Sequence, residues 1–96
     1  MHDICVFCEM NPGSIIADTE LSLAINDRYP VSRGHTLIMP RRHVASIFEL
    51  TDSEYTDILS LMRLVKAQHV AEYQPDGWNS GINDGVAAGQ TIMHLH

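Results

Sequence analysis

Short, mostly apolar runs separated by polar or turn-forming residues occupy the first half of the chain, as they do in proteins built of short strands. Two runs rich in strand-forming residues, Ser14–Ala17 and Leu21–Ile25, are joined by the polar Asp18-Thr19-Glu20, which predicts a hairpin. A third such run, His35–Met39, is apolar and ends at Pro40. We therefore expect three strands before the middle of the chain.

The middle of the chain changes to helical periodicity. Thr51 and Glu54 have the spacing of a capping box, so a helix is expected to begin at Thr51. Seven residues recur at helical spacing and predict one core-facing stripe: Tyr55, Ile58, Leu59, Met62, Val65, His69 and Val70. Pro75-Asp76-Gly77 is expected to end the helix. A short helical turn is expected over 44–48.

Strand-like patterns return after the helix. Residues 78–82 are predicted as a strand, Asn83-Asp84-Gly85 as a turn, and residues 89–96 as the final strand. Strands, helix and strands in this order, without a repeating β-α-β rhythm, favour an α+β fold. We expect one domain over 1–96, with an antiparallel sheet of about five strands, one main helix and a short helix.

The predicted final strand carries two histidines. Side chains on a strand repeat every second residue, so His94 and His96 are expected on the same face, with Gln90 and Ile92. Two adjacent imidazoles can bind a metal, or one can act as a nucleophile that the other supports. They can also be two polar residues on a solvated face, and the spacing alone leaves these alternatives open.

Composition and charge narrow the function classes. The chain has 96 residues, of which 45% are hydrophobic, and it has no apolar run of the length that spans a bilayer. No secretory signal pattern opens it. The net charge of −6, from 6 basic and 12 acidic residues, argues against general polynucleotide binding but not against one nucleotide held by local donors. We expect a cytoplasmic protein that binds neither membrane nor polynucleotide.

Cys5 and Cys8 form a Cys-x-x-Cys motif. A thioredoxin-type redox pair would need a helix to open at the motif, and Asn11-Pro12-Gly13 follows instead. A turn with two thiolates is a common half of a tetrahedral zinc site, whose other half can be two histidines. Spacing does not choose among the candidates His2, His35, His43, His69, His94 and His96. Two unconnected buried thiols remain the alternative.

Two blocks of motif residues, the predicted hairpin and Asn26-Asp27 together carry a family resemblance. The segment Pro30–His43 is similar to the pattern P-x-x-x-G-H-x-L-x-x-P-x-x-H of the histidine triad (HIT) family. Asn83-Asp84-Gly85, Gly89-Gln90-Thr91 and His94-Leu95-His96 resemble the second block, which ends in the triad H-φ-H-φ-H-φ-φ. The chain stops at His96, so the third histidine of the pattern is absent. If the chain ends there, we expect it to fold but to catalyse the hydrolysis typical of the family poorly.

The resemblance implies a nucleotidyl hydrolase or transferase. Such enzymes act at the α-phosphate of nucleoside polyphosphates, phosphoramidates or adenylylated substrates. His96 would be the catalytic nucleophile and would form a nucleotidyl-histidine intermediate. Asp27 would bind the ribose hydroxyls. The other nucleotide-binding positions implied are His35, Asn83, Gln90 and Thr91.

The resemblance also implies a structural zinc ion and a homodimer. The family-matched ligands are Cys5, Cys8, His43 and His94, in a closed site that would clip the N-terminus to the last strand. A non-enzymatic, zinc-clipped nucleotide-binding module is the competing interpretation, favoured by the missing third histidine. A thiol redox protein is a weaker third interpretation.

Overall fold

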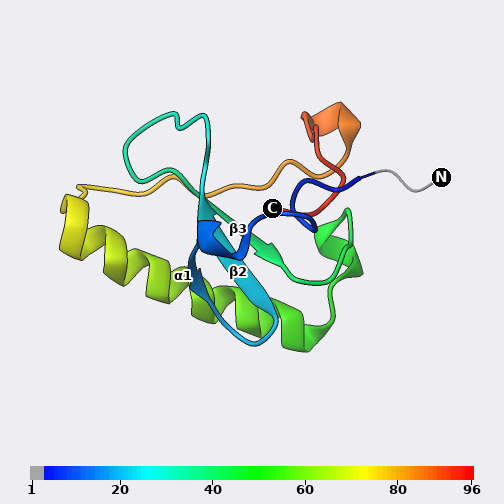
Figure 1. The fold of residues 1–96 in the computed structure, drawn as a ribbon, viewed down its shortest axis with the longest axis horizontal. Helices are drawn as coiled ribbons and strands as arrows, with labels where there is room; N and C mark the ends of the chain where they lie inside the picture. Colours follow the sequence, from blue (N-terminus) through cyan, green and yellow to red (C-terminus); the bar gives the residue numbers. More distant parts are fainter. Residues whose placement is uncertain (1–3) are drawn as a thin grey trace.

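The computed structural model describes residues 4–96 as a small antiparallel sheet beside one long helix (Figure 1). The sheet has the order β1 (Ile15–Asp18), β2 (Ser22–Asn26) and β3 (Thr36–Pro40). Both strand pairs are antiparallel, and β1 carries an irregularity between Ile15 and Ala17. Each of the three strands predicted before the helix is present, one residue further along the chain than the pattern indicated.

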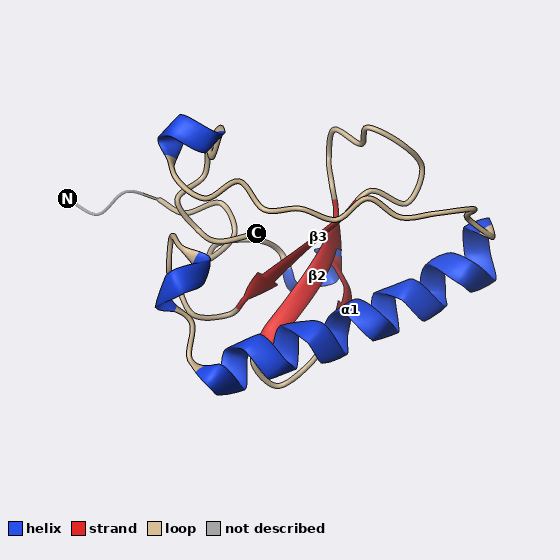
Figure 2. Cartoon of the chain, turned by 180° about the vertical axis from the view of Figure 1, so that it is seen from behind, coloured by secondary structure: helices blue, strands red, loops and turns tan. Residues whose placement is uncertain are grey.

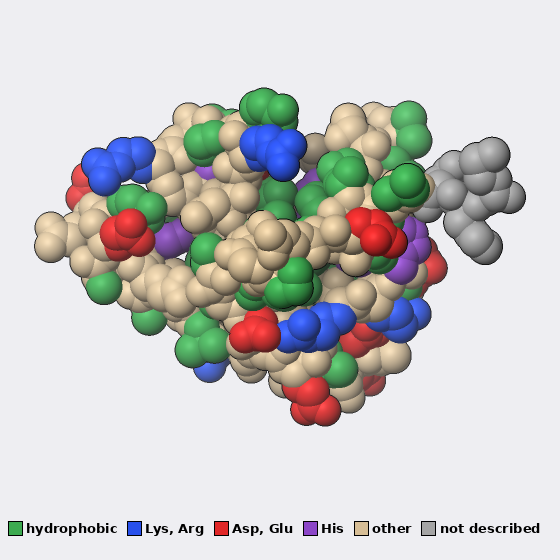
Figure 3. Space-filling view, in the orientation of Figure 1, with side chains coloured by type: hydrophobic (Ala, Val, Ile, Leu, Met, Phe, Trp, Pro, Cys, Tyr) green, Lys and Arg blue, Asp and Glu red, His purple; other side chains and the backbone are tan. Residues whose placement is uncertain are grey.

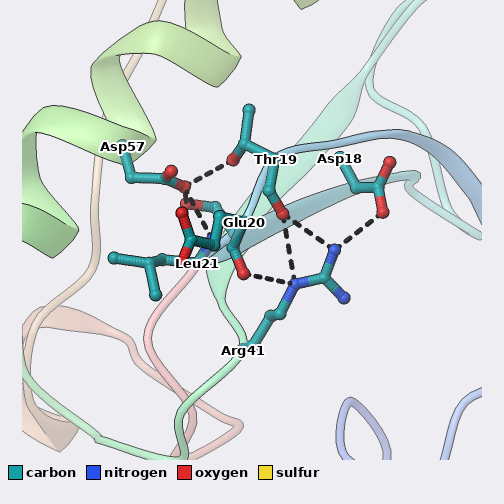
Figure 4. A network of polar contacts seen from close by, with 7 residues as sticks. Asp18, Thr19, Glu20, Leu21, Arg41 and Asp57 are labelled. Atoms are coloured by element: carbon teal, nitrogen blue, oxygen red, sulfur yellow. Dashed lines mark hydrogen bonds and ion pairs between the residues drawn. The ribbon is translucent and has the colours of Figure 1, made fainter.

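The turn between β1 and β2 is fastened to the helix by the Asp57 carboxylate (Figure 4). Asp57 accepts hydrogen bonds from the hydroxyls of Thr19 and Ser22, and from the N–H of Leu21 at 3.2 Å. Burial raises the pKa of Asp57, but these hydrogen bonds outweigh it and hold the pKa below its usual value. Arg41 donates to carbonyl oxygens of the same turn at 2.8–3.2 Å. The hairpin is therefore held at both ends of its turn.

Helix α1 (Asp52–Tyr73) begins with the predicted capping box. The Thr51 hydroxyl accepts from the N–H of Glu54 at 3.2 Å, and the Glu54 carboxylate accepts from the N–H of Thr51 at 2.9 Å. Arg42 donates to the same carboxylate at 2.7 Å and, with Thr51, lowers the pKa of Glu54 to about 2. The helix ends before Gln74, whose φ of 51° is left-handed, and the predicted stop at residues 75–77 is confirmed.

One face of α1 covers the sheet (Figures 1 and 2). Leu61 and Val65 are buried against Ala24 of β2. The predicted stripe is right for Val65, misses the fully buried Leu61, and is wrong for Leu59 and Val70, which are 60% and 47% exposed. Apolar residues lie on more than one side of this helix, so periodicity alone could not decide which side meets the sheet.

The two strands predicted after the helix are not formed. Residues 78–82 and 89–96 are irregular, so within residues 4–96 the sheet has three strands rather than about five. A strand needs a neighbouring chain to complete its hydrogen-bond ladder, and an alternating pattern does not supply one. Among residues 91–96, one backbone hydrogen bond reaches another segment, from Leu95 N to Val44 O at 2.7 Å. The α+β class with one main helix is nevertheless confirmed.

Short 3₁₀ turns replace regular structure in the connections. They are η1 (Pro12–Ser14), η2 (Ile47–Glu49) and η3 (Val86–Ala88). The turn η2 corresponds to the short helical turn expected over 44–48, and Ser46 caps it by accepting from Phe48 N at 3.1 Å.

Two small hydrophobic clusters join the ends of the chain to the sheet and to α1. Phe7 packs with Leu23 and Met39, and Ile92 packs against this group. Leu95 is buried in a second cluster, with Val44 and Leu50. The chain's last residues therefore lie beside its N-terminal turn (Figure 1).

Acidic and basic side chains are interspersed on the face drawn in Figure 3. No helix within residues 4–96 combines the length and the apolar content needed to cross a bilayer.

Candidate functional site

The four predicted metal ligands lie close together. The sulfur atoms of Cys5 and Cys8 and a ring nitrogen from each of His43 and His94 lie within 4.8 Å of one another. Nδ1 of His94 is 3.5 Å from Cys5 Sγ and 3.6 Å from Cys8 Sγ, and Nδ1 of His43 is 3.4 Å from Cys8 Sγ. Tetrahedral zinc, with bonds of about 2.3 Å to sulfur and about 2.0–2.1 Å to nitrogen, places such atoms about 3.5–3.6 Å apart. The donor set fits a zinc ion.

The cysteines lie on a tight turn near the N-terminus. The N–H of Glu9 donates to the carbonyl of Cys5 at 3.0 Å and closes the turn. Both thiols are free. Desolvation, followed by the neighbouring Cys5, raises the pKa of the Cys8 thiol. A bound cation would reverse this preference and favour the thiolate.

The ring of His94 is fixed by contacts at both nitrogens. His94 is buried, and its Nε2 lies 2.8 Å from the carbonyl oxygen of Pro40. A carbonyl only accepts, so Nε2 carries the proton and the lone pair of Nδ1 faces the thiols. Burial lowers the pKa of His94 and favours the neutral ring. A backbone acceptor behind a ligating histidine is the usual support of a metal site.

His96 lies beside this cluster, and its tautomer is also defined. Its Nδ1 lies 2.8 Å from the backbone carbonyl oxygen of His94. Because the carbonyl can only accept, Nδ1 carries the proton and Nε2 holds the free lone pair. The ring centroid of Phe7 is 5.0 Å from that of His96 and 5.8 Å from that of His94.

The structure places Asp27 and His35 together in the connection between β2 and β3. Asp27 Oδ2 lies 3.4 Å from Nε2 of His35, and Asp27 Oδ1 accepts from Tyr29 N at 3.0 Å. His35 Nδ1 accepts from Val31 N at 3.1 Å, so His35 carries its proton on Nε2, toward Asp27. Within residues 4–96, no hydrogen bond joins this pair to His94 or His96.

The connection that carries Asp27 and His35 is fastened to the end of α1. Gly34 has a φ of 82°, and a Cβ there would lie 2.8 Å from the ring of Tyr73. The Thr36 hydroxyl contacts Nε2 of His69 at 3.0 Å. His69 therefore packs and bonds at the sheet, away from the metal cluster.

The predicted nucleotide-binding residues near Gln90 differ in their exposure to solvent. Asn83 and Thr91 are exposed, whereas Gln90 is buried. The Gln90 carboxamide accepts from Gly85 N at 2.8 Å and donates to the carbonyls of Ala45 and Ile92 at 2.9 and 3.0 Å. All of its polar atoms are thus bonded within the chain.

Two residues that shape the site, Asp84 and Phe7, carry no functional signal in the sequence. The Asp84 carboxylate accepts from Ser46 Oγ and Ile47 N, both at 2.9 Å, and ties the Asn83–Thr91 segment to η2. The sequence signal at Asp84 was turn chemistry, which does not identify a partner 38 residues away. Phe7 was an unassigned residue between the two cysteines.

A hollow of about 320 Å³ adjoins the metal cluster. It is lined by Ile4, Cys5, Val6, His43, Thr91, Ile92 and Met93. A larger hollow of about 420 Å³ lies between the β1–β2 turn and the start of α1, and none of the predicted site residues lines it.

Comparison with known proteins identifies one family. The family described as HIT domain matches residues 9–96. An adenosine 5'-monophosphoramidase of Schizosaccharomyces pombe is 38% identical over 96 residues, which cover 96% of this chain and 69% of that protein. A bis(5'-nucleosyl)-tetraphosphatase from the same organism is 42% identical over 80 residues, or 81% of this chain and 43% of that protein.

Solved structures share the fold. A HIT family protein from Bacillus anthracis superposes with a TM-score of 0.89 at 36% identity, and the match covers 100% of this chain and 71% of that one. A zinc-bound histidine triad family protein from Mycobacterium smegmatis superposes with a TM-score of 0.84 at 32% identity, over 96% of this chain and 70% of that one.

Proposed function

This chain belongs to the HIT family, and from that premise we propose that it hydrolyses nucleotides at the α-phosphate. The substrate class is a nucleoside polyphosphate, phosphoramidate or adenylylated compound. Relatives named as a phosphoramidase and a tetraphosphatase support the general activity. They differ in the group that leaves the nucleotide, so the leaving group of this chain is a question for experiment.

The contact between His96 Nδ1 and the carbonyl oxygen of His94 is the observation that carries the mechanism. Nδ1 donates its proton to His94 O, with 2.8 Å between the nitrogen and the oxygen, so the neutral ring offers Nε2 as a nucleophile. In the first step Nε2 forms a bond to the α-phosphorus, and the leaving group departs with the electron pair of its own bond. Water then cleaves the nitrogen–phosphorus bond, which releases the nucleoside monophosphate and regenerates the imidazole.

Five further residues are proposed to bind the nucleotide or to position the groups that bind it. Asp27 would bind the ribose hydroxyls, and His35 would hold that carboxylate, since its Nε2 faces Asp27 at 3.4 Å. The exposed Thr91 and Asn83 would donate to the phosphate. Gln90 would act by shaping the segment that presents Thr91, because its own side chain is bonded internally.

We further propose that Cys5, Cys8, His43 and His94 hold a structural zinc ion, supported by their spacing and by the zinc-bound neighbour. When bound, zinc would supply a rigid cross-link between the N-terminal turn and His94, with no open coordination position for substrate.

We also propose a homodimeric assembly and a cytoplasmic location. A homodimer is supported by exposed apolar side chains on α1, among them Leu59, Leu64 and Val70, and sedimentation measures it. A cytoplasmic location stays a prediction.

The test is turnover of a panel of adenosine phosphoramidate, dinucleoside polyphosphate and adenylyl sulfate by the zinc-loaded protein. We expect release of adenosine monophosphate from at least one of them, and loss of that release in His96→Ala. Binding of adenosine monophosphate without turnover of any compound would instead support a nucleotide-binding module.

A further inference from the structure

We propose that Phe7 is a positioning residue for His96, and that its ring forms the wall that holds the imidazole with Nε2 free. The inference deepens the proposed function and rests on it, because it assumes that His96 is the reacting group. It also gives the Cys-x-x-Cys turn a role beyond holding a metal, since Phe7 lies between the two cysteines.

The two residues between the cysteines lie in opposite environments. Val6 is 56% exposed, whereas Phe7 is 9% exposed and packs against Leu23 of β2 and Met39 of β3. The sheet therefore fixes one side of the Phe7 ring, and the turn that Glu9 N closes onto Cys5 O fixes its backbone. A ring held in this way is a rigid surface for whatever lies on its other side.

Both histidines of the last segment contact that ring. The Phe7 and His94 planes are at 89° with centroids 5.8 Å apart, and the Phe7 and His96 planes are at 66° with centroids 5.0 Å apart. These are edge contacts of the kind that aromatic pairs favour. The nearer of the two is the contact with His96, which is not among the four residues of the metal cluster.

His96 needs this second support. A single hydrogen bond from Nδ1 to His94 O orients the ring only while it lasts, because rotation about χ2 is soft and moves Nδ1 off the carbonyl. Rotation would also move the Nε2 lone pair off the line of attack. A neighbouring ring that fills the space needed for rotation keeps the hydrogen bond and the direction of Nε2 together.

Two matched variants separate positioning from stability. Phe7→Leu removes the ring and keeps an apolar side chain, and Leu23→Val trims the same cluster while leaving every aromatic ring in place. Both keep all four residues of the metal cluster, and zinc content is measured in each. For Phe7→Leu we expect kcat to fall by about tenfold to a hundredfold with KM nearly unchanged, because the nucleophile and not the nucleotide is disturbed. Leu23→Val should keep kcat within about twofold of wild type.

A spectroscopic experiment tests the contact between Phe7 and His96 without measuring turnover. In zinc-loaded wild type, nuclear Overhauser contacts should join Phe7 ring protons to His96 ring protons, and the His96 nitrogens should report a single Nδ1–H tautomer. In Phe7→Leu we expect mixed tautomers at His96, while Leu23→Val keeps the single one. Absence of the Phe7–His96 contacts in wild type would overturn the proposal without any variant.

The kinetic and spectroscopic measurements together distinguish failure of this inference from failure of the proposed function. Lower kcat with mixed tautomers in Phe7→Leu alone supports the positioning role. An unchanged tautomer in Phe7→Leu, or equal loss of kcat in both variants, overturns it. No turnover in wild type, with mixed tautomers in Phe7→Leu alone, overturns the proposed function but keeps the orientation of His96 by Phe7.

Discussion

The backbone carbonyl of His94 accepts a hydrogen bond from Nδ1 of His96 at 2.8 Å. The side chain of the same His94 faces the thiols of Cys5 and Cys8 through Nδ1. His94 therefore belongs to the candidate metal cluster through its ring and contacts the candidate nucleophile through its backbone. Whatever fixes His94 also fixes the position of the carbonyl that accepts from His96.

Zinc should stabilise the folded chain through its four clustered residues. Stabilisation by a ligand that binds only the folded state is about 2.7 kcal/mol when free zinc is 100 times Kd. We expect urea unfolding with and without zinc to differ by about this amount in wild type. Replacement of a predicted ligand, His43→Ala, should abolish most of the difference, and His35→Ala should retain it. An equal zinc response in the two variants would contradict the assignment of His43.

Zinc binding should release protons and weaken as the pH falls. The pKa of the Cys8 thiol is raised in the metal-free chain, so this thiol binds as a thiolate only after it loses its proton. The proton is present below the raised pKa, and metal must displace it throughout that range. Calorimetric titration at neutral pH in two buffers of different ionisation enthalpy should show this release. An enthalpy independent of the buffer would contradict this proton release.

Asp27 should recognise the ribose and not the phosphate. Hydrogen bonds to a charged group contribute roughly 1.5–3 kcal/mol, so Asp27→Asn should weaken adenosine monophosphate roughly ten- to hundredfold. Binding of inorganic phosphate should change little. Asp76→Asn, at an exposed acid just beyond α1, is the matched control and should affect neither ligand. Equal weakening of both ligands by Asp27→Asn, measured by calorimetry, would assign another role to Asp27.

Gln90 should contribute to stability more than to nucleotide contact. Gln90→Ala leaves the N–H of Gly85 and the carbonyls of Ala45 and Ile92 without their partner. Loss of a buried partner costs roughly 1–3 kcal/mol, and we expect that decrease in the free energy of unfolding. Gln68→Ala, which removes one exposed bond to Ile16 O at 3.3 Å, is the control. Equal stability of the two variants in urea would contradict the role given to Gln90.

The sequence correctly predicted those elements whose position depends on residues close together in the chain. The hairpin, the strand 36–40 and the Thr51 capping box depend on neighbouring residues, and each was found within one residue. The segments 78–82 and 89–96 were wrong as strands because pairing depends on chains far away in the sequence. Leu61 is buried and Leu59 is exposed because of where the sheet lies against the helix, which the helix sequence alone does not give.

The candidate site likewise has residues that the sequence indicated and contacts that only the structure shows. Residue type and family resemblance indicated Cys5, Cys8, His43 and His94, which the fold brings within 4.8 Å. The partners of Phe7 and Asp84 come from segments 89 and 38 residues away, and no local pattern identifies them. Tautomers also required the structure, since they follow from the carbonyl oxygens that Nε2 of His94 and Nδ1 of His96 face.

Detection of the covalent intermediate tests the central proposal most directly. Zinc-loaded protein is mixed with adenosine phosphoramidate, quenched at alkaline pH within the first turnover, digested, and examined by mass spectrometry. We predict one added adenosine monophosphate on the peptide that contains His96, and loss of adduct and turnover by at least about 10³-fold in His96→Ala but not in His69→Ala. Turnover that continues in His96→Ala, with no adduct in wild type, would contradict the account.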